Sequence, residues 1–263
     1  IRKNTKKIGV GCFYKSSLNK IEMPKNSELE SIENYAFYST FIDYFYIPAS
    51  VKKIGSYAFD HCRTLEISKD SEYIKFENRS IISIENLLIF SQKIEFDNEW
   101  NGSILTLNNI ELSKSITQYK YIDGKYLAGK SDPNSDVYDT LLYVARNSYV
   151  ATIPSYIKII SNYAFSNCII LRQIMFEENS KLTVINNTAF KCESLTTITI
   201  PKHVKKIPEF VFYKHGNLKC VNFDENSELE SIEESAFQFT GIEYIKIPKN
   251  VKIIANYAFN NCV

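Results

Sequence analysis

Residues 192–212 read CESLTTITIPKHVKKIPEFVF, and variants of this pattern return in both halves of the chain. Residues 26–37, NSELESIENYAF, reappear at 226–237 as NSELESIEESAF. The stretch IPASVKKIGSYAFDHC, which ends at Cys62, matches IPKNVKIIANYAFNNC, which ends at Cys262. Such self-similarity indicates a repeat array, because each unit is too small to bury its own apolar face and must stack on its neighbours. The sequence therefore predicts a solenoid.

A phenylalanine closes each repeat and sets the period. The repeats end at Phe13, Phe37, Phe59, Phe165, Phe190, Phe212, Phe237 and Phe259. Within each group, spacings of 22 residues alternate with spacings of 24 or 25. We expect one continuous curved array in which these rings form a single buried column, since each ring occupies the same position of its repeat.

Six segments with the pattern L-x-x-I-x-I lie between these phenylalanines. They are Leu18-Ile21-Met23, Ile42-Phe45-Ile47, Leu171-Ile174-Phe176, Leu195-Ile198-Ile200, Leu218-Val221-Phe223 and Ile242-Ile245-Ile247. Their last three positions alternate as a short strand does. In the short repeats Pro follows directly and ends the strand, because it cannot donate to a ladder. We expect a parallel ladder of these strands.

The combined pattern, C-x-x-L-x-x-I-x-I-P followed by V-x-x-I-x-x-x-A-F, resembles the BspA-like leucine-rich repeat, also called the Treponema pallidum type. The match covers residues 5–67 and 148–263. The resemblance implies a leucine-rich-repeat solenoid, curved and right-handed. Such a solenoid is an α/β-type repeat array of mostly short parallel β-strands with convex turns or short helical segments. The resemblance further implies surface adhesion through binding to cells or matrix proteins, and it supplies no catalytic residues.

Three segments follow from this match. Residues 1–67 and 148–263 are the N-terminal and C-terminal leucine-rich repeats, and residues 68–147 are irregular or degenerate repeats. The interval from Phe59 to Phe165 could hold four to five units and contains the only Trp, Trp100. We favour eroded repeats that continue the solenoid over an inserted subdomain.

Charge and hydropathy exclude several classes of partner. Lys plus Arg number 31 against 30 for Asp plus Glu, so no global basic field favours nucleic acid. No apolar run approaches the roughly 18 to 20 residues that span a bilayer, so we expect no membrane insertion of this segment. The chain begins without Met and stops within a repeat, which indicates a piece of a longer protein.

The cysteines and histidines follow the repeat. Cys62, Cys168, Cys192 and Cys262 share one repeat position, and Cys12 replaces the Ala of Ala-Phe. We expect reduced core thiols, with a disulfide between Cys168 and Cys192 as the one pairing that stacking would permit. The three histidines, His61, His203 and His215, fall in different repeats without a zinc-ligand cluster or a catalytic signature. We therefore predict no metal, no cofactor and no enzymatic activity.

Two columns of side chains should project from the concave strand face, because these side chains are not needed in the buried core. The first is Lys20, Tyr44, Gln173, Thr197, Cys220 and Tyr244, and the second is Glu22, Tyr46, Met175, Thr199, Asn222 and Lys246. Cys220 would be an exposed thiol, and the other eleven form the candidate binding face. The tyrosines are the expected anchors, because Tyr is enriched at interface hot spots. The alternative is that they only protect an exposed sheet.

The predicted function is protein binding, for which two settings remain open. The first is a cell-surface or secreted adhesion module that contacts a host-cell or matrix protein, and the second is a cytoplasmic scaffold of the same fold. Glycosylation triplets at Asn78, Asn101 and Asn186 favour the first, and reduced thiols favour the second.

Overall fold

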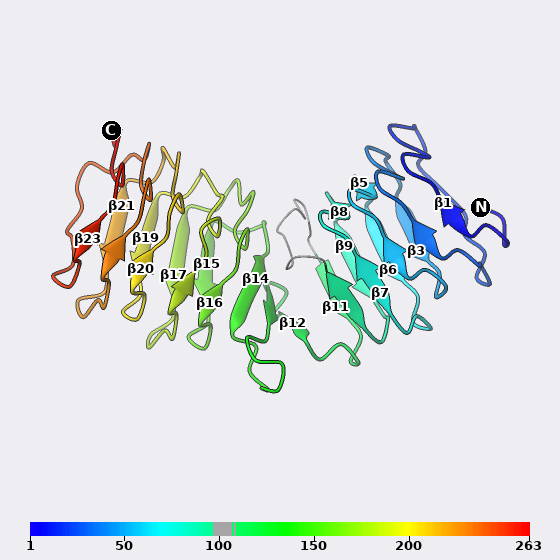
Figure 1. The fold of residues 1–263 in the computed structure, drawn as a ribbon, viewed down its shortest axis with the longest axis horizontal. Coiled ribbons are helices and arrows are strands. Elements are labelled where there is room, and N and C mark those ends of the chain that lie inside the picture. Colours follow the sequence, from blue (N-terminus) through cyan, green and yellow to red (C-terminus); the bar gives the residue numbers. More distant parts are fainter. Residues whose placement is uncertain (97–106, 108) are drawn as a thin grey trace. The chain divides into compact units, whose positions relative to one another are not determined.

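The computed structural model describes residues 1–96, 107 and 109–263, so Trp100 and Asn101 lie outside the described residues. These residues divide into two compact units, 1–124 and 125–263, inside the segment expected to be irregular. Each unit is a β-solenoid in which short parallel strands lie side by side (Figure 1). No helix occurs among the described residues, so turns take the place of the short helical segments that the resemblance implied.

Unit 1 carries a ladder of four-residue strands, here called its long-strand ladder. It consists of β3 (Tyr44–Ile47), β6 (Thr64–Ile67), β9 (Asn86–Ile89) and β11 (Asn109–Leu112), all parallel. The ladder runs past residue 67 because β9 and β11 keep the apolar alternation: Leu87, Ile89 and Ile110 are buried. β12 (Tyr119–Ile122) lies beside β11.

A second ladder of shorter strands lies on another side of each coil of unit 1. It contains β1 (Lys7–Ile8), β2 (Ser31–Ile32), β4 (Lys53–Ile54), β7 (Ile74–Phe76) and β10 (Ile94–Phe96). A third line of pairing joins β5 (Phe59–Asp60) to β8 (Ile81–Ile82) at the Ala-Phe turns. Neighbouring coils of unit 1 therefore pair along as many as three lines, whereas the sequence pattern predicted one strand per repeat.

Unit 2 repeats this plan. Its long-strand ladder is β15 (Val150–Ile153), β17 (Gln173–Phe176), β19 (Thr197–Ile200) and β21 (Cys220–Phe223). Its short strands are β16 (Ile159–Ile160), β18 (Val184–Ile185), β20 (Lys206–Ile207), β22 (Ser231–Ile232) and β23 (Ile253–Ile254). One departure is β13 (Tyr126–Gly129), which pairs antiparallel with β14 (Thr140–Val144), and β14 then pairs parallel with β16.

Two of the six predicted L-x-x-I-x-I strands do not form. Residues 18–23 make one backbone hydrogen bond toward the β3 segment, from Asp43 N to Asn19 O at 3.1 Å. Residues 242–247 make no backbone hydrogen bond to β21 among the described residues. The strand pattern alone was therefore insufficient, because a strand also needs a neighbour in register.

The repeat phenylalanines stack as predicted within each unit. Ring centroids lie 5.1 and 5.3 Å apart along Phe13, Phe37 and Phe59. In unit 2 they lie 5.1 to 5.3 Å apart along Phe165, Phe190, Phe212, Phe237 and Phe259. Six of the eight rings are fully buried. Phe13 and Phe259 are half-buried, because each lies in an end coil with a described coil on one side only, whereas Phe59 and Phe165 are covered on both sides.

The backbone around each Ala-Phe pair explains the regularity of the stack. The amide of Phe37 donates to Ala58 O at 2.8 Å, and the amide of Phe237 donates to Ala258 O at 2.8 Å. At seven of the eight rings, Phe190 being the exception, the residues two positions before and after the ring adopt positive φ, for example Tyr35 at 58° and Ser39 at 57°. This left-handed geometry is unfavourable for a bulky residue, so packing between repeats must hold it in place.

The four cysteines that share one repeat position lie in the core of the coils or at its edge. Cys62, Cys168 and Cys192 are buried, and Cys262 is half-buried. Burial raises the pKa of the Cys62 thiol to about 12 and raises the pKa of Cys192 well above its ordinary value. Cys12 is exposed, contrary to its expected core position, because the side of its repeat away from Phe37 carries no described neighbour. Cys220 is exposed, as predicted.

We predict that Phe212→Ala lowers the free energy of unfolding by about 3 to 5 kcal/mol, because it removes a buried ring that contacts Phe190 and Phe237. The measurement is chemical denaturation. Phe239→Ala is the control, since that ring is 41% exposed, and it should cost about 1 kcal/mol or less. Equal losses of unfolding free energy in the two variants would contradict the prediction that the phenylalanine stack stabilises the fold.

We also predict that Cys12 and Cys220 react rapidly with a thiol reagent in the native protein. Cys62, Cys168 and Cys192 should react only after denaturation, because burial disfavours the thiolate that is the reacting species. Titration before and after denaturation measures both classes. Replacing Cys12 and Cys220 by Ser should remove the rapid phase of these two thiols, and rapid native reaction of the buried three would disprove the assignment.

Candidate functional site

The outward side chains of each long-strand ladder form a regular surface. We call this surface the ladder face of each unit. In unit 1 it comprises Tyr44, Thr64, Asn86, Asn109, Tyr46, Glu66, Leu88 and Glu111. In unit 2 it comprises Val150, Gln173, Thr197, Cys220, Thr152, Met175, Thr199 and Asn222. All are exposed or half-exposed, whereas the residues between them point into the core.

The structure brings together part of the set predicted from sequence. Gln173, Met175, Thr197, Thr199 and Asn222 share the ladder face of unit 2 with Cys220. Tyr44 and Tyr46 lie on the ladder face of unit 1.

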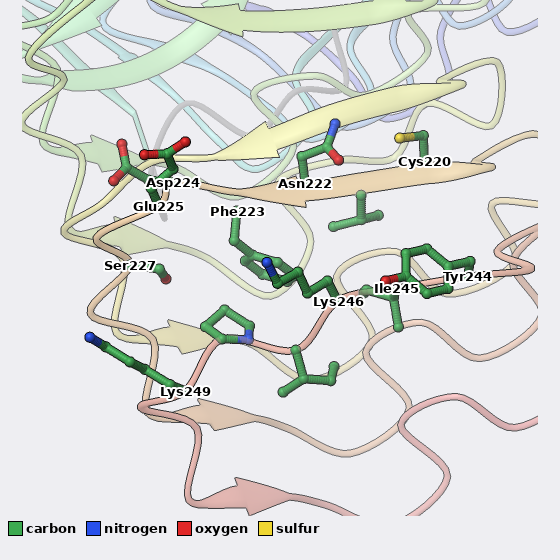
Figure 2. A pocket seen from close by; sticks show the side chains of 13 residues that line it. Cys220, Asn222, Phe223, Asp224, Glu225, Ser227, Tyr244, Ile245, Lys246 and Lys249 are labelled. Carbon is green, nitrogen blue, oxygen red and sulfur yellow. The ribbon is translucent and has the colours of Figure 1, made fainter.

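Four members of the predicted set lie outside both ladder faces. Tyr244 and Lys246 are exposed on the unpaired segment beside β21 (Figure 2). Lys20 and Glu22 form a solvent-exposed ion pair with each other at 3.1 Å.

Several ladder-face residues were missed by the sequence analysis. They are Thr64, Glu66, Asn86, Leu88, Asn109, Glu111, Val150 and Thr152. Their strands, TLEI, NLLI, NIEL and VATI, do alternate. These four strands lack one or more of the Phe, Pro and Cys residues that defined the repeat. Alternation of apolar and polar residues was therefore the only sequence signal for their outward positions.

The ladder face of unit 1 is held by contacts among its own side chains. The Tyr44 hydroxyl donates to Glu66 Oε2 at 2.8 Å, and Asn86 Nδ2 donates to Thr64 Oγ1 at 3.3 Å. Burial, the hydrogen bond to Glu66 and the Glu66 charge raise the pKa of Tyr44 to about 12. Tyr44 is nevertheless 47% exposed. The tyrosine therefore both protects the sheet and offers a ring to solvent.

The ladder face of unit 2 has a different chemistry. None of its eight residues is Asp, Glu, Lys, Arg or His. Val150 and Met175 are exposed apolar side chains. No hydrogen bond or ion pair among the described residues uses these eight side chains. The polar groups of Gln173, Thr197 and Asn222 are therefore available to a partner.

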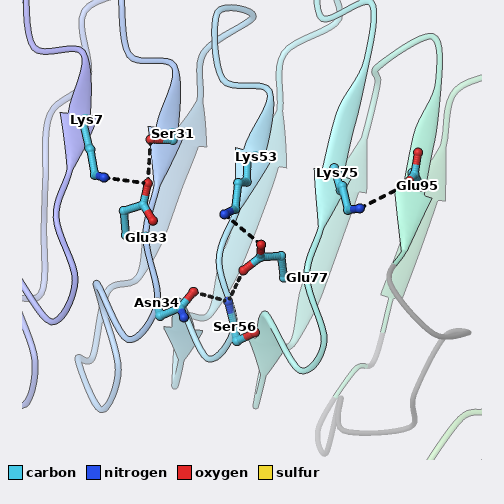
Figure 3. A network of polar contacts seen from close by, with 9 residues as sticks. All are labelled: Lys7, Ser31, Glu33, Asn34, Lys53, Ser56, Lys75, Glu77 and Glu95. Carbon is cyan, nitrogen blue, oxygen red and sulfur yellow. Dashed lines mark hydrogen bonds and ion pairs between the residues drawn. The ribbon is translucent and has the colours of Figure 1, made fainter.

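The short-strand ladder of unit 1 carries a row of lysine–glutamate ion pairs. Lys7 pairs with Glu33 at 3.2 Å, Lys53 with Glu77 at 2.8 Å, and Lys75 with Glu95 at 3.2 Å (Figure 3). Burial acts to raise the pKa of Glu33, but Lys7 and Ser31 outweigh it and hold that pKa below its ordinary value. On this side of the coil, the lysines of the short strands are therefore neutralised by glutamates of the neighbouring coils.

A surface tyrosine cluster at the Ala-Phe turns of unit 1 was also missed. Tyr14 stacks on Tyr38 with centroids 5.4 Å apart, and Tyr35 stacks on Tyr57 at 5.1 Å. The available signal was the Tyr in N-Y-A-F and S-Y-A-F. Because these rings cover one another's faces, the cluster offers mainly ring edges to solvent.

The histidines stand apart from one another. His61 contacts Asp60, and His203 contacts Glu228, each at 3.0 Å. His215 is buried, and burial lowers its pKa. Among the described residues, no three His, Cys, Asp or Glu side chains are grouped so that they could hold a metal ion. Of the two described glycosylation triplets, Asn78 is exposed and Asn186 is half-exposed.

Nowhere in the described part of the chain does a helix reach the length and apolar character needed to cross a membrane.

Comparison with known proteins agrees with this architecture. Several solved structures share the fold, among them the following three. The pneumococcal vaccine antigen PcpA has a TM-score of 0.54 and 18% identity, covering 95% of this chain and 71% of PcpA. A leucine-rich cell surface protein from Faecalibacterium prausnitzii A2-165 has a TM-score of 0.55 and 18% identity, covering 95% of this chain and 76% of that one. A leucine-rich repeat protein from Eubacterium ventriosum ATCC 27560 has a TM-score of 0.52 and 16% identity, covering 89% and 83%.

No curated protein matches the chain. The family model described as BspA type leucine-rich repeat region matches residues 1–99 and 140–263 in six copies. These residues include the Cys, Pro and Ala-Phe positions that carry the repeat. The chain therefore belongs to the BspA-type leucine-rich repeat family.

Proposed function

We propose that this chain is a non-enzymatic protein-binding module whose main contact surface is the ladder face of unit 2. The observation that carries the proposal is the eight-residue patch described above, which is exposed or half-exposed, holds no Asp, Glu, Lys, Arg or His, and makes no side-chain hydrogen bond or ion pair within the described residues. Interface cores are depleted of charged residues and favour side chains that can be desolvated at low cost. The ion-paired short-strand side would lose its solvation on binding, so it is the less favourable surface.

The proposed setting is a cell surface, where the module would contact a host-cell or matrix protein. Two of the similar structures support this setting, since one is a vaccine antigen and another a cell surface protein. An intracellular scaffold is the second candidate. The exposed thiols of Cys12 and Cys220 favour it, because oxidising compartments tend to pair exposed cysteines.

Labelling of intact cells with an impermeant reagent separates the two settings. A surface module should be labelled before the cells are lysed. A scaffold should be labelled only afterwards.

We predict that Met175→Glu weakens binding to a partner at least about tenfold, because it introduces a charge into the centre of the uncharged face. Binding is measured against a panel of matrix proteins and host-cell surface proteins. Val184→Glu is the matched control: Met175 is 46% exposed on a long strand, and Val184 is 43% exposed on a short strand. Equal loss in both variants would reject the ladder face of unit 2 as the contact surface.

The tyrosines of unit 1 supply a separate test. Replacing Tyr44 and Tyr46 together by Ala should cost at least about 2 kcal/mol of binding free energy if they are anchors. The melting temperature should stay nearly unchanged, because neither side chain is fully buried. Unchanged affinity, or loss only when Glu30 and Glu33 are replaced, would remove these tyrosines from the binding surface.

A further inference from the structure

A groove of about 420 Å³ lies between β21 and residues 244–249 (Figure 2). One wall is the free edge of β21, and the other is the segment whose strand pattern is not realised as a strand. Residues 197–200 of β19 pair with β21 on its opposite edge. The groove therefore lies at the place where the next strand of the ladder would stand.

Both walls offer unpaired backbone groups. The amides of Cys220 and Asp224 donate to Thr196 O and Ile200 O, toward β19. Because backbone groups alternate in direction along a strand, the N–H and C=O groups of Val221 and Phe223 face the groove. No backbone hydrogen bond from these two residues to residues 244–247 exists in the described structure. Since such groups favour pairing, the groove can receive another strand on its β21 side.

The side chains of the groove are also incompletely satisfied. Phe223 lines the groove and is half-exposed, whereas Ile200, its partner on β19, is buried, and Ile245 and Ile247 on the facing wall are also half-exposed. Asp224 and Glu225 gather at one end of β21, and Lys246 and Lys249 lie on the facing wall. None of these four charged residues belongs to an ion pair of the described residues. An inserted segment could cover the apolar positions and pair with both charged walls.

We propose that this groove binds an extended segment of a partner polypeptide as an added β-strand. Backbone hydrogen bonds to Val221 and Phe223 would supply the affinity, and the alternating side chains would supply the selectivity. The favoured segment alternates apolar residues and carries a basic residue toward Asp224 and Glu225 and an acidic residue toward Lys246 and Lys249. This site adjoins the ladder face of unit 2, with which it shares Cys220 and Asn222, and it lies two strands away from Met175 at the centre of that face.

The probe is an acetylated peptide that copies residues 242–249, IEYIKIPK, because the repeat pattern selects this alternation for the edge of β21. Its control is the same peptide with N-methyl groups on alternate amides, which removes backbone donors and leaves the side chains unchanged. We expect the control to bind at least about tenfold more weakly. Equal binding of the two peptides, or binding of neither, would overturn the proposal.

Amide hydrogen exchange measures directly whether the backbone groups at the free edge of β21 are hydrogen-bonded. The amides of Val221 and Phe223 should exchange rapidly in the free protein and become protected when the peptide is added. Protection in the free monomer would show that residues 242–247 already close the groove. Protection that appears only on self-association would make a second copy of this chain the occupant. Either result overturns the proposal.

A reversible clamp supplies the matched test. Tyr244→Cys, in a protein that also carries Cys12→Ser and Cys262→Ser, places a thiol across the groove from Cys220. The reduced form should bind the peptide, and a Cys220 disulfide that draws the walls together should abolish binding. Equal binding by the reduced and oxidised forms would overturn the proposal. If no disulfide forms, the N-methyl comparison decides the question. Met175→Glu should leave peptide binding unchanged, because Met175 lies on β17 and β19 stands between it and the groove, which distinguishes the groove from the centre of the ladder face.

Discussion

The stack of buried phenylalanine rings is the constraint on which the other features of each unit depend. Neighbouring rings lie 5.1 to 5.3 Å apart, close to the roughly 4.8 Å spacing of paired strands. Repeats of different length must therefore deliver the ring to the same place. Long repeats place their N-S segment in the turn before the short strand, where Ser27 and Ser227 are buried and bond to the amides of Leu29 and Leu229. The ring position is kept, and the turn absorbs the difference.

Stacking of equivalent residues also sorts the surface by chemistry. A residue type that recurs at one repeat position becomes a row when the repeats stack. On the short-strand side, Lys at the strand and Glu in the next repeat produce ion pairs such as Lys7 with Glu33 and Lys53 with Glu77. On the long-strand side of unit 2, uncharged residues recur at the outward positions. The same fold thus gives a short-strand side whose charges are paired with one another and, in unit 2, a long-strand side whose uncharged side chains are available to a partner.

A strand at the edge of a ladder leaves backbone hydrogen-bonding groups unpaired. Interior strands such as β6 and β19 have parallel neighbours on both edges. β21 has one, and the facing residues 244–247 leave half-exposed apolar side chains and unpaired backbone groups. An edge of this kind is a template for strand addition, which natural proteins normally block with a charge, a proline or a covering segment. Pro248 and the lysines beside it stand on the facing wall and not on β21 itself.

The sequence by itself determined the repeat, the family, the solenoid and the stacked rings, because Phe, Pro and Cys recur at fixed spacing and each has one physical role in the coil. It also placed Gln173, Met175 and Thr199 on an outward row, since alternation along a strand is local. Only the tertiary structure decided which outward residues share a surface. Tyr44 and Tyr244 match in repeat position, yet they belong to different compact units. The strands at 86–89 and 109–112 joined the ladder without a Phe marker, because burial of Leu87 and Ile110 between neighbours was sufficient. The segment at 242–247 carries the full pattern and stays unpaired, because hydrogen bonding between strands depends on the approach of a neighbour and not on the local sequence.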